Sequence, residues 1–267
     1  MEAFFLYGFL QRAFLAGIFV AIACAFLGVF LILRRDAMIG HGLAHVAFAG
    51  VALGLFLNVM PLAGALFIAV IASWIIMVLK VKAGLHGDTA IAIFSSVGFA
   101  SGILLTSLSH RFNVDLFSYL FGEILAIETS EVIFAIVLAF IVVLLVVSNY
   151  RKFMYMTFDR ESAKASGIKV GKLDSLLTIL TAVTVVLGMK VVGILLVSAL
   201  VVIPAAASLQ VASSFKQAIV YASCISVSSV ALGLLLAFQL DMPASGSIVL
   251  LSFLAFGILF LIGRYRR

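Results

Sequence analysis

Long apolar runs recur along the whole of this 267-residue chain. A bilayer core about 30 Å thick is crossed by about 20 apolar residues in a helix that rises about 1.5 Å per residue. Backbone groups inside lipid must pair within the protein, so such runs fold as α-helices. The sequence therefore predicts an all-α polytopic membrane protein with about eight to nine transmembrane helices plus short interfacial helices, in one domain, 1–267. The predicted spans are 13–33, 41–60, 62–79, 89–108, 132–148, 173–189, 191–210, 218–240 and 247–263.

The composition agrees with this class of protein. Hydrophobic residues make up 65% of the chain and charged residues 10%, against about half and a quarter in soluble domains. The net charge of +6 reflects the loops of a membrane protein, so it gives no reason to expect a nucleic-acid partner. Cys24 and Cys224 lie in separate apolar runs and indicate neither a disulfide framework nor a cysteine metal site. The first run is interpreted as a span, because its arginines follow it, whereas a signal peptide carries them in front.

Two segments depart from the pattern of regular spans. The apolar segment 118–127 is too short to cross, and we interpret it as an interfacial or re-entrant helix. The spans 173–189 and 191–210 are joined only by GMKVVG, which predicts either a tight hairpin or one broken element.

Small residues and one proline indicate how some spans pack. Ala47, Gly50 and Gly54 recur at a spacing of three to four residues, which predicts close contact between helix backbones. Pro204 predicts a kink in its helix, because proline cannot donate a backbone hydrogen bond.

The distribution of basic residues predicts the orientation in the membrane. With the N-terminus outside, the inner loops and the C-terminus hold 14 of the 17 lysines and arginines, and only Arg12, Arg111 and Lys190 remain outside. Cytoplasmic loops carry such an excess. We therefore expect an external N-terminus and a cytoplasmic C-terminus, with the basic loop 149–172 in the cytoplasm.

Two of the four histidines, His41 and His45, lie one helical turn apart at the start of an apolar run. Residues four apart face the same way on a helix, and two imidazoles so placed can share one transition-metal ion. Ionisable residues inside a membrane are usually functional. Two other interpretations remain open, namely a buried pair satisfied by neighbouring helices and a pair in the headgroup zone near Arg34 and Arg35. An intramembrane zinc protease is excluded, because the HExxH motif needs glutamate where Gly42 stands.

The most polar stretch of the chain is MTFDRESAKASGIKVGKLD, 156–174. Asp159 is a good N-cap for the short helical stretch RESAKAS, and Gly167 can end that helix. Such a helix in a cytoplasmic loop suggests docking to a soluble partner, although an ordinary solvated loop would have the same pattern. The GIKVGK that follows has its glycines one residue too close for a P-loop, and we find no other nucleotide-binding motif. If ATP drives transport, another subunit must bind it.

Five ordered stretches, which together extend over nearly the whole chain, carry a family resemblance: 34–54, 113–127, 158–168, 190–207 and 241–250. In these stretches the sequence resembles the permease subunits of ATP-binding-cassette (ABC) importers for zinc, manganese and related metals, most closely the ZnuB-type zinc permeases.

The resemblance implies a transmembrane permease of the bacterial plasma (inner) membrane, surrounded by lipid, that has no enzymatic activity or permanent cofactor of its own. Its partners would be a second permease copy, cytoplasmic ABC ATPase subunits and an extracytoplasmic metal-binding protein. The transported ion would be zinc, with manganese or iron as alternatives. The coupling helix that contacts the ATPase would include Phe158, Asp159, Arg160, Glu161, Ala163 and Gly167.

The resemblance also bears on the metal site. His45 matches the family's histidine on this helix, and His41 occupies the position where the family commonly has aspartate. Imidazole in place of carboxylate favours zinc over manganese. Glu123, at a position that is commonly acidic in the family, and Asp241 are weaker candidate ligands near the outer mouth, and each would equally fit as a surface carboxylate. A stand-alone ion-coupled metal transporter is the alternative class, but the chain shows no obvious inverted repeat of charged, broken helices.

Overall fold

The computed structural model describes residues 7–82, 87–108 and 114–266, and within these ranges the chain forms helices and no strands. The long helices are α2 (Gly8–Leu33), α3 (Met38–Leu57), α4 (Pro61–Lys82), α5 (Gly87–Leu108), α7 (Thr129–Ser148), α10 (Val170–Val192), α12 (Phe215–Leu240) and α13 (Ala244–Arg266). The shorter ones are α6 (Val114–Phe121), the 3₁₀ helix η1 (Ile124–Ala126), α8 (Tyr150–Phe158), α9 (Arg160–Ala165) and α11 (Val197–Leu209).

The all-α polytopic fold predicted from the sequence is confirmed. Eight of the described helices are long and apolar enough to cross a membrane. The ninth predicted span, 191–210, corresponds to the 13-residue helix α11, which is shorter than a full crossing requires. The segment 118–127 also forms no long helix, and it is divided between the end of α6 and η1.

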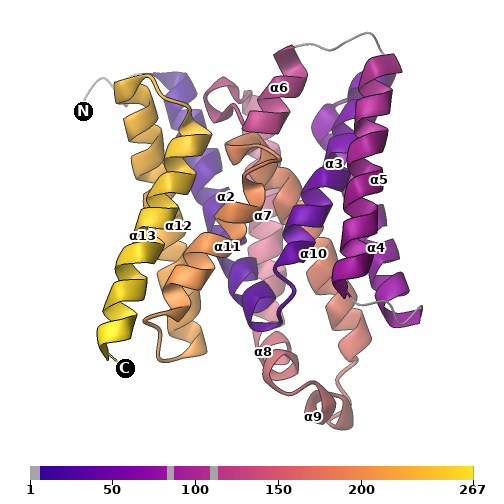
Figure 1. The fold of residues 1–267 in the computed structure, drawn as a ribbon, viewed down its shortest axis with the longest axis vertical. Helices are drawn as coiled ribbons and strands as arrows, with labels where there is room; N and C mark the ends of the chain where they lie inside the picture. The colour runs from indigo at the N-terminus through magenta and orange to yellow at the C-terminus, as the bar shows by residue number, and fades with distance from the viewer. Residues whose placement is uncertain (1–6, 83–86, 109–113, 267) are drawn as a thin grey trace.

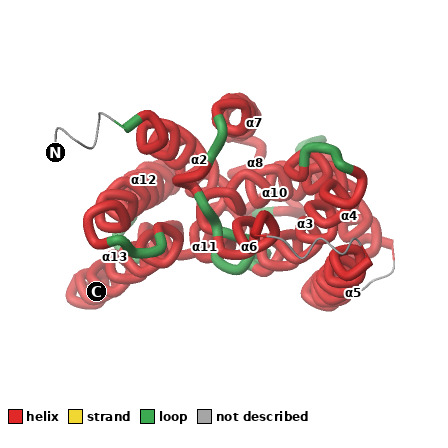
Figure 2. The backbone as a smooth tube through the Cα atoms, turned by 90° about the horizontal axis from the view of Figure 1, so that it is seen from above, coloured by secondary structure: helices red, strands yellow, loops and turns green. Residues whose placement is uncertain are grey.

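The helices form two groups with α10 between them (Figures 1 and 2). On one side α2 packs against α11 and α12, and α13 lies outside them. On the other side α3 packs against both α4 and α5. Helix α10 contacts members of both groups. Helices α8 and α9 extend from the end of the bundle where α13 finishes, whereas the start of α2 and helix α6 lie at the opposite end (Figure 1).

Glycines bring α3 into close contact with the helices on its two flanks. A Cβ added at Gly50 would lie 2.5 Å from Cα of Ala65 in α4, and one added at Gly54 would lie 2.8 Å from Cα of Pro61. On the other flank, a Cβ added at Gly98 of α5 would lie 2.7 Å from Cα of Val46. The close packing predicted from the small residues of this helix is therefore confirmed. Its consequence is that backbone contacts, rather than the histidines, fix the position of α3.

A glycine turn separates α10 from α11. Gly193 has a φ of +84°, a conformation that favours glycine. The next two backbone N–H groups, of Ile194 and Leu195, donate to the carbonyls of Tyr119 and Leu120 at 3.0 and 3.3 Å. The turn thus begins where the predicted GMKVVG connection ends, and its amides are paired with the end of α6. Pro204 lies inside α11.

Candidate metal site

A tight turn after α2 sets the start of the helix that carries the histidines. Arg35 adopts a positive φ of 59°. The next residue, Asp36, donates its N–H to the carbonyl of Leu31 in α2 at 2.9 Å, and its own carbonyl accepts the N–H of Ile39 in α3 at 3.1 Å. The backbone of Asp36 therefore joins the last turn of α2 to the first turn of α3, and His41 follows Ile39 by two residues.

The structure places the imidazoles of His41 and His45 against each other. Their Nε2 atoms are 3.2 Å apart, and the rings are nearly perpendicular, at 86°. Two zinc–nitrogen bonds of about 2.0–2.1 Å at a tetrahedral angle would separate the two nitrogens by about 3.3 Å. The spacing therefore suits a shared ion, and a direct hydrogen bond between two neutral tautomers would have a similar length.

The surroundings of His45 are mostly apolar. Phe99 of α5 lies edge-on to its ring, with the centroids 5.2 Å apart, and Phe48 packs beside Phe99. The Nδ1 atom of His45 is buried and has no hydrogen-bond partner within the described parts of the chain. Satisfaction of His45 by polar groups of neighbouring helices, one of the two alternative interpretations, is therefore not what the described residues show.

The other candidate ligands lie elsewhere. Glu123 is exposed at the start of η1, in a pocket that also contains Glu128, Glu131 and Lys190. Asp241 is exposed at the end of α12, with a φ of 52°. Across the described ranges, no three residues of the types His, Cys, Asp and Glu form a group that could hold a metal. Of the predicted ligands, His41 and His45 are the two that the structure brings together, and His86 and His110 lie outside the described residues.

The environment of Gly42 adds a steric reason against a metalloprotease. A Cβ at this position would collide with the side chain of Ile91 in α5. A glutamate general base could therefore be accommodated there only if the side chain of Ile91 shifted.

The polar segment after α8 folds as the sequence predicts. The carboxylate of Asp159 accepts the N–H of Ser162 at 2.9 Å and so caps α9, and hydrogen bonds from Ser162 hold the pKa of Asp159 below its usual value. Gly167 follows the helix with a φ of +80°. Ala163 is fully buried, whereas the side chain of Phe158 is 66% exposed at the edge of the segment. The helix N-cap and the glycine stop are confirmed.

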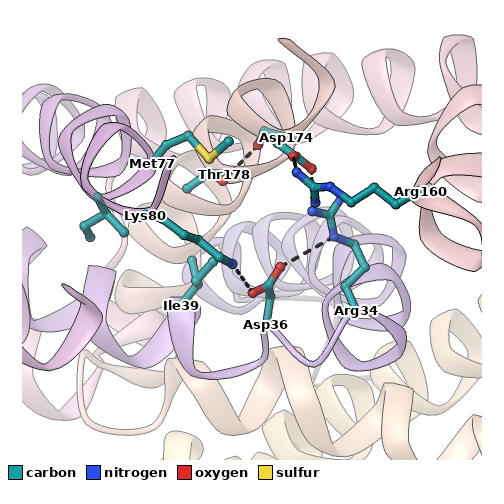
Figure 3. Close-up of a pocket in the computed structure, with 9 residues that line it drawn as sticks. Arg34, Asp36, Ile39, Met77, Lys80, Arg160, Asp174 and Thr178 are labelled. Carbon is teal, nitrogen blue, oxygen red and sulfur yellow. Dashed lines mark hydrogen bonds and ion pairs between the residues drawn. The ribbon is translucent and has the colours of Figure 1, made fainter. Parts of the chain in front are cut away.

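The sequence did not predict a cluster of charged residues near α9, although one member, Arg160, was among the predicted coupling residues. The cluster contains Arg34, Asp36, Lys80, Arg160 and Asp174, which line one cavity (Figure 3). Asp174 ends the polar stretch 156–174 and lies in the predicted span 173–189; in the structure it belongs to α10, which begins at Val170, and its carboxylate is 3% exposed. The sequence shows oppositely charged residues near the ends of separate spans, but it does not show which of them form ion pairs.

Several known proteins are similar to this chain over nearly its whole length. The chain is 33% identical over 259 residues to the manganese import system permease protein ScaB of Streptococcus gordonii, covering 97% of this chain and 93% of that protein. It is 32% identical over 255 residues to the high-affinity zinc uptake system membrane protein ZnuB of Haemophilus influenzae, covering 96% of each. The solved structure of PsaBC from Streptococcus pneumoniae in complex with Fab matches with a TM-score of 0.87 and 32% identity, over 97% of this chain and 95% of that chain. Residues 6–263 match the ABC 3 transport family, and the chain belongs to that family.

Proposed function

We propose that this chain is the membrane permease of an ATP-driven importer for a divalent transition metal, and that zinc is the physiological ion. The observation that carries the proposal is the His41–His45 pair, with its nitrogens 3.2 Å apart on a helix inside the bundle. Imidazole nitrogen suits zinc better than manganese. Zinc takes four ligands, so water or groups outside the described residues complete the coordination.

The names of two relatives support a transporter built from several subunits. The words "import system permease protein" for ScaB and "uptake system membrane protein" for ZnuB describe single components of larger systems. We propose that a cytoplasmic ABC ATPase contacts α9, that an extracytoplasmic protein delivers the metal, and that two permease copies assemble. In this arrangement the permease contributes the pathway, and the ATPase contributes hydrolysis.

The test is uptake into proteoliposomes that contain the permease with its ATPase, supplied with the metal-binding protein. Zinc uptake should require ATP inside the vesicles and should stop when the ATPase is omitted. Uptake that continues at full rate without the ATPase would instead identify a stand-alone, ion-coupled transporter.

Manganese is the second candidate ion, because ScaB is named for manganese import. Replacing His41 by Asp substitutes a hard oxygen ligand for a nitrogen ligand, so the ratio of manganese to zinc uptake should rise on the order of tenfold, or ~1.4 kcal/mol. His41→Asn is the matched control, because it has the shape of aspartate without the charge and should transport both ions poorly. An unchanged ion preference in His41→Asp, at normal protein levels, would contradict a role for this residue in selectivity.

We also propose that the end of the bundle with α8, α9 and the finish of α13 faces the cytoplasm. The ground is the excess of lysine and arginine in the loops at that end of the bundle. In intact cells, a membrane-impermeant thiol reagent should label a cysteine placed at the α12–α13 turn and leave one placed in α9 unlabelled, with Cys24 and Cys224 replaced beforehand. Labelling of the α9 cysteine from outside would reverse the proposed orientation.

A further inference from the structure

A charged cavity of about 310 Å³ lies between α9 and the start of α3 (Figure 3). Its charged residues come from four parts of the chain that are far apart in sequence. They are Arg34 and Asp36 in the α2–α3 turn, Lys80 at the end of α4, Arg160 at the start of α9 and Asp174 in α10. Three cations and two carboxylates are therefore gathered in one place, next to the segment that the ATPase would contact.

Asp174 is shared between α9 and the α2–α3 turn. Its Oδ1 accepts from Nη2 of Arg34 at 2.5 Å, and its Oδ2 accepts from Nη2 of Arg160. Its backbone carbonyl accepts the hydroxyl of Thr178 at 2.9 Å, which is an ordinary contact within α10. The carboxylate is thus the one group in Figure 3 that pairs with both arginines.

The chain of ion pairs continues from Arg34 to the histidine helix. Nε of Arg34 lies 3.5 Å from Oδ2 of Asp36, and Nζ of Lys80 lies 2.6 Å from its Oδ1. The backbone of Asp36 in turn accepts the N–H of Ile39 in the first turn of α3. A chain of ion pairs and one backbone hydrogen bond therefore connects the start of α9 with the first turn of α3, where His41 lies.

The ion pairs of this chain of contacts differ in how far their side chains are exposed to solvent. The pair of Arg34 and Asp174 is buried, and removing either partner would leave a buried charge uncompensated. The Arg160 side chain is 48% exposed, so its pair with Asp174 is held more weakly. Arg34 also has a second carboxylate within reach and a buried Nη1 without a hydrogen-bond partner in the described chain. If Arg160 were displaced with α9, Asp174 would lose one of its two arginine partners, and the attraction of Arg34 to Asp174 relative to Asp36 would change.

We propose that Asp174 is a positioning residue that transmits displacement of α9, through Arg34 and Asp36, to the first turn of α3 and so to the histidine pair. This inference rests on the proposed function, because it assumes that an ATPase moves α9. It adds the physical path by which nucleotide-driven motion reaches the metal ligands.

The test compares Arg160→Gln, Asp174→Asn and the double variant in the reconstituted complex. For each, zinc uptake per ATP hydrolysed is measured together with the amount of ATPase bound and the zinc affinity without nucleotide. Uptake per ATP should fall about tenfold in each single variant, while zinc affinity without nucleotide stays near wild type. The double variant should be no worse than Asp174→Asn alone, because both substitutions break the same link. A role in stability alone would lower the amount of complex but leave uptake per ATP unchanged.

Glu131→Gln is the matched control. It removes a buried carboxylate from its ion pair with Lys190, at 3.1 Å, near the opposite end of the bundle, and it should leave uptake per ATP unchanged. If Asp174→Asn does not assemble, Arg160→Gln decides alone, since a half-exposed pair contributes little to stability. Wild-type uptake per ATP in Arg160→Gln, or in an assembled Asp174→Asn, overturns the inference. Failure of the proposed function is distinguishable, because the wild-type complex itself would then show no ATP-dependent uptake.

Discussion

Replacing His45 by alanine is expected to reduce zinc uptake by about two orders of magnitude or more, while the amount of folded protein in the membrane stays near wild type. Loss of a group that only orients a ligand typically costs about 10–100-fold in metal affinity or activity, so loss of a ligand itself should cost at least as much. Folding should be preserved because α3 is held by glycine contacts with α4 and α5, and not by the imidazole. Uptake assays and quantification of membrane protein check both parts.

His41→Ala is the companion variant, and His45→Gln is the control that retains a polar group of similar size. If the pair served only to hold helices together, the alanine variants would lose assembled protein, and the molecules that remained would still transport. Wild-type zinc uptake in both alanine variants would end the metal-site proposal.

Replacing Ala163 by phenylalanine is expected to separate ATP hydrolysis from transport. Ala163 is fully buried on α9, and its carbonyl accepts the N–H of Ile168 at 3.1 Å, so a large side chain must displace the helix. Zinc uptake per ATP hydrolysed should fall by about tenfold or more, with the permease still inserted and the ATPase still bound.

Ala163→Ser adds a single atom and should retain most of the coupling. Exposed Phe158 offers an independent check on the docking surface, since buried aromatic residues commonly anchor interfaces. Normal uptake in Ala163→Phe, with the ATPase bound, would show that α9 is not the coupling segment.

Local features were predictable from the sequence because local rules determine them. The cap at Asp159 and the stop at Gly167 need only the residues of α9 itself, and the approach of His41 to His45 follows from helical spacing. The prediction of 191–210 as a full crossing is wrong. The apolar composition of this segment shows neither the positive φ of Gly193 nor the pairing of the next two backbone amides with the end of α6.

Long-range pairings were beyond the reach of the sequence pattern. Arg34 and Asp174 are 140 residues apart, and nothing in either segment names the other as its partner. Asp174 follows two lysines at the end of a polar stretch, and nothing in that stretch shows that the fold buries its carboxylate near the start of α10. A buried carboxylate becomes tolerable only once two arginines converge on it, which is a property of the packed helices.

Zinc K-edge X-ray absorption of the purified complex tests the metal site most directly. His86 and His110 are first replaced by glutamine, so that His41 and His45 are the remaining histidines of the chain. The zinc-loaded protein should then show scattering from imidazole rings with zinc–nitrogen distances of about 2.0–2.1 Å. That signal should disappear when His41 and His45 are both replaced by alanine. An imidazole signal that persists unchanged in the double alanine variant, or that is absent when both histidines are present, would contradict zinc binding by this pair.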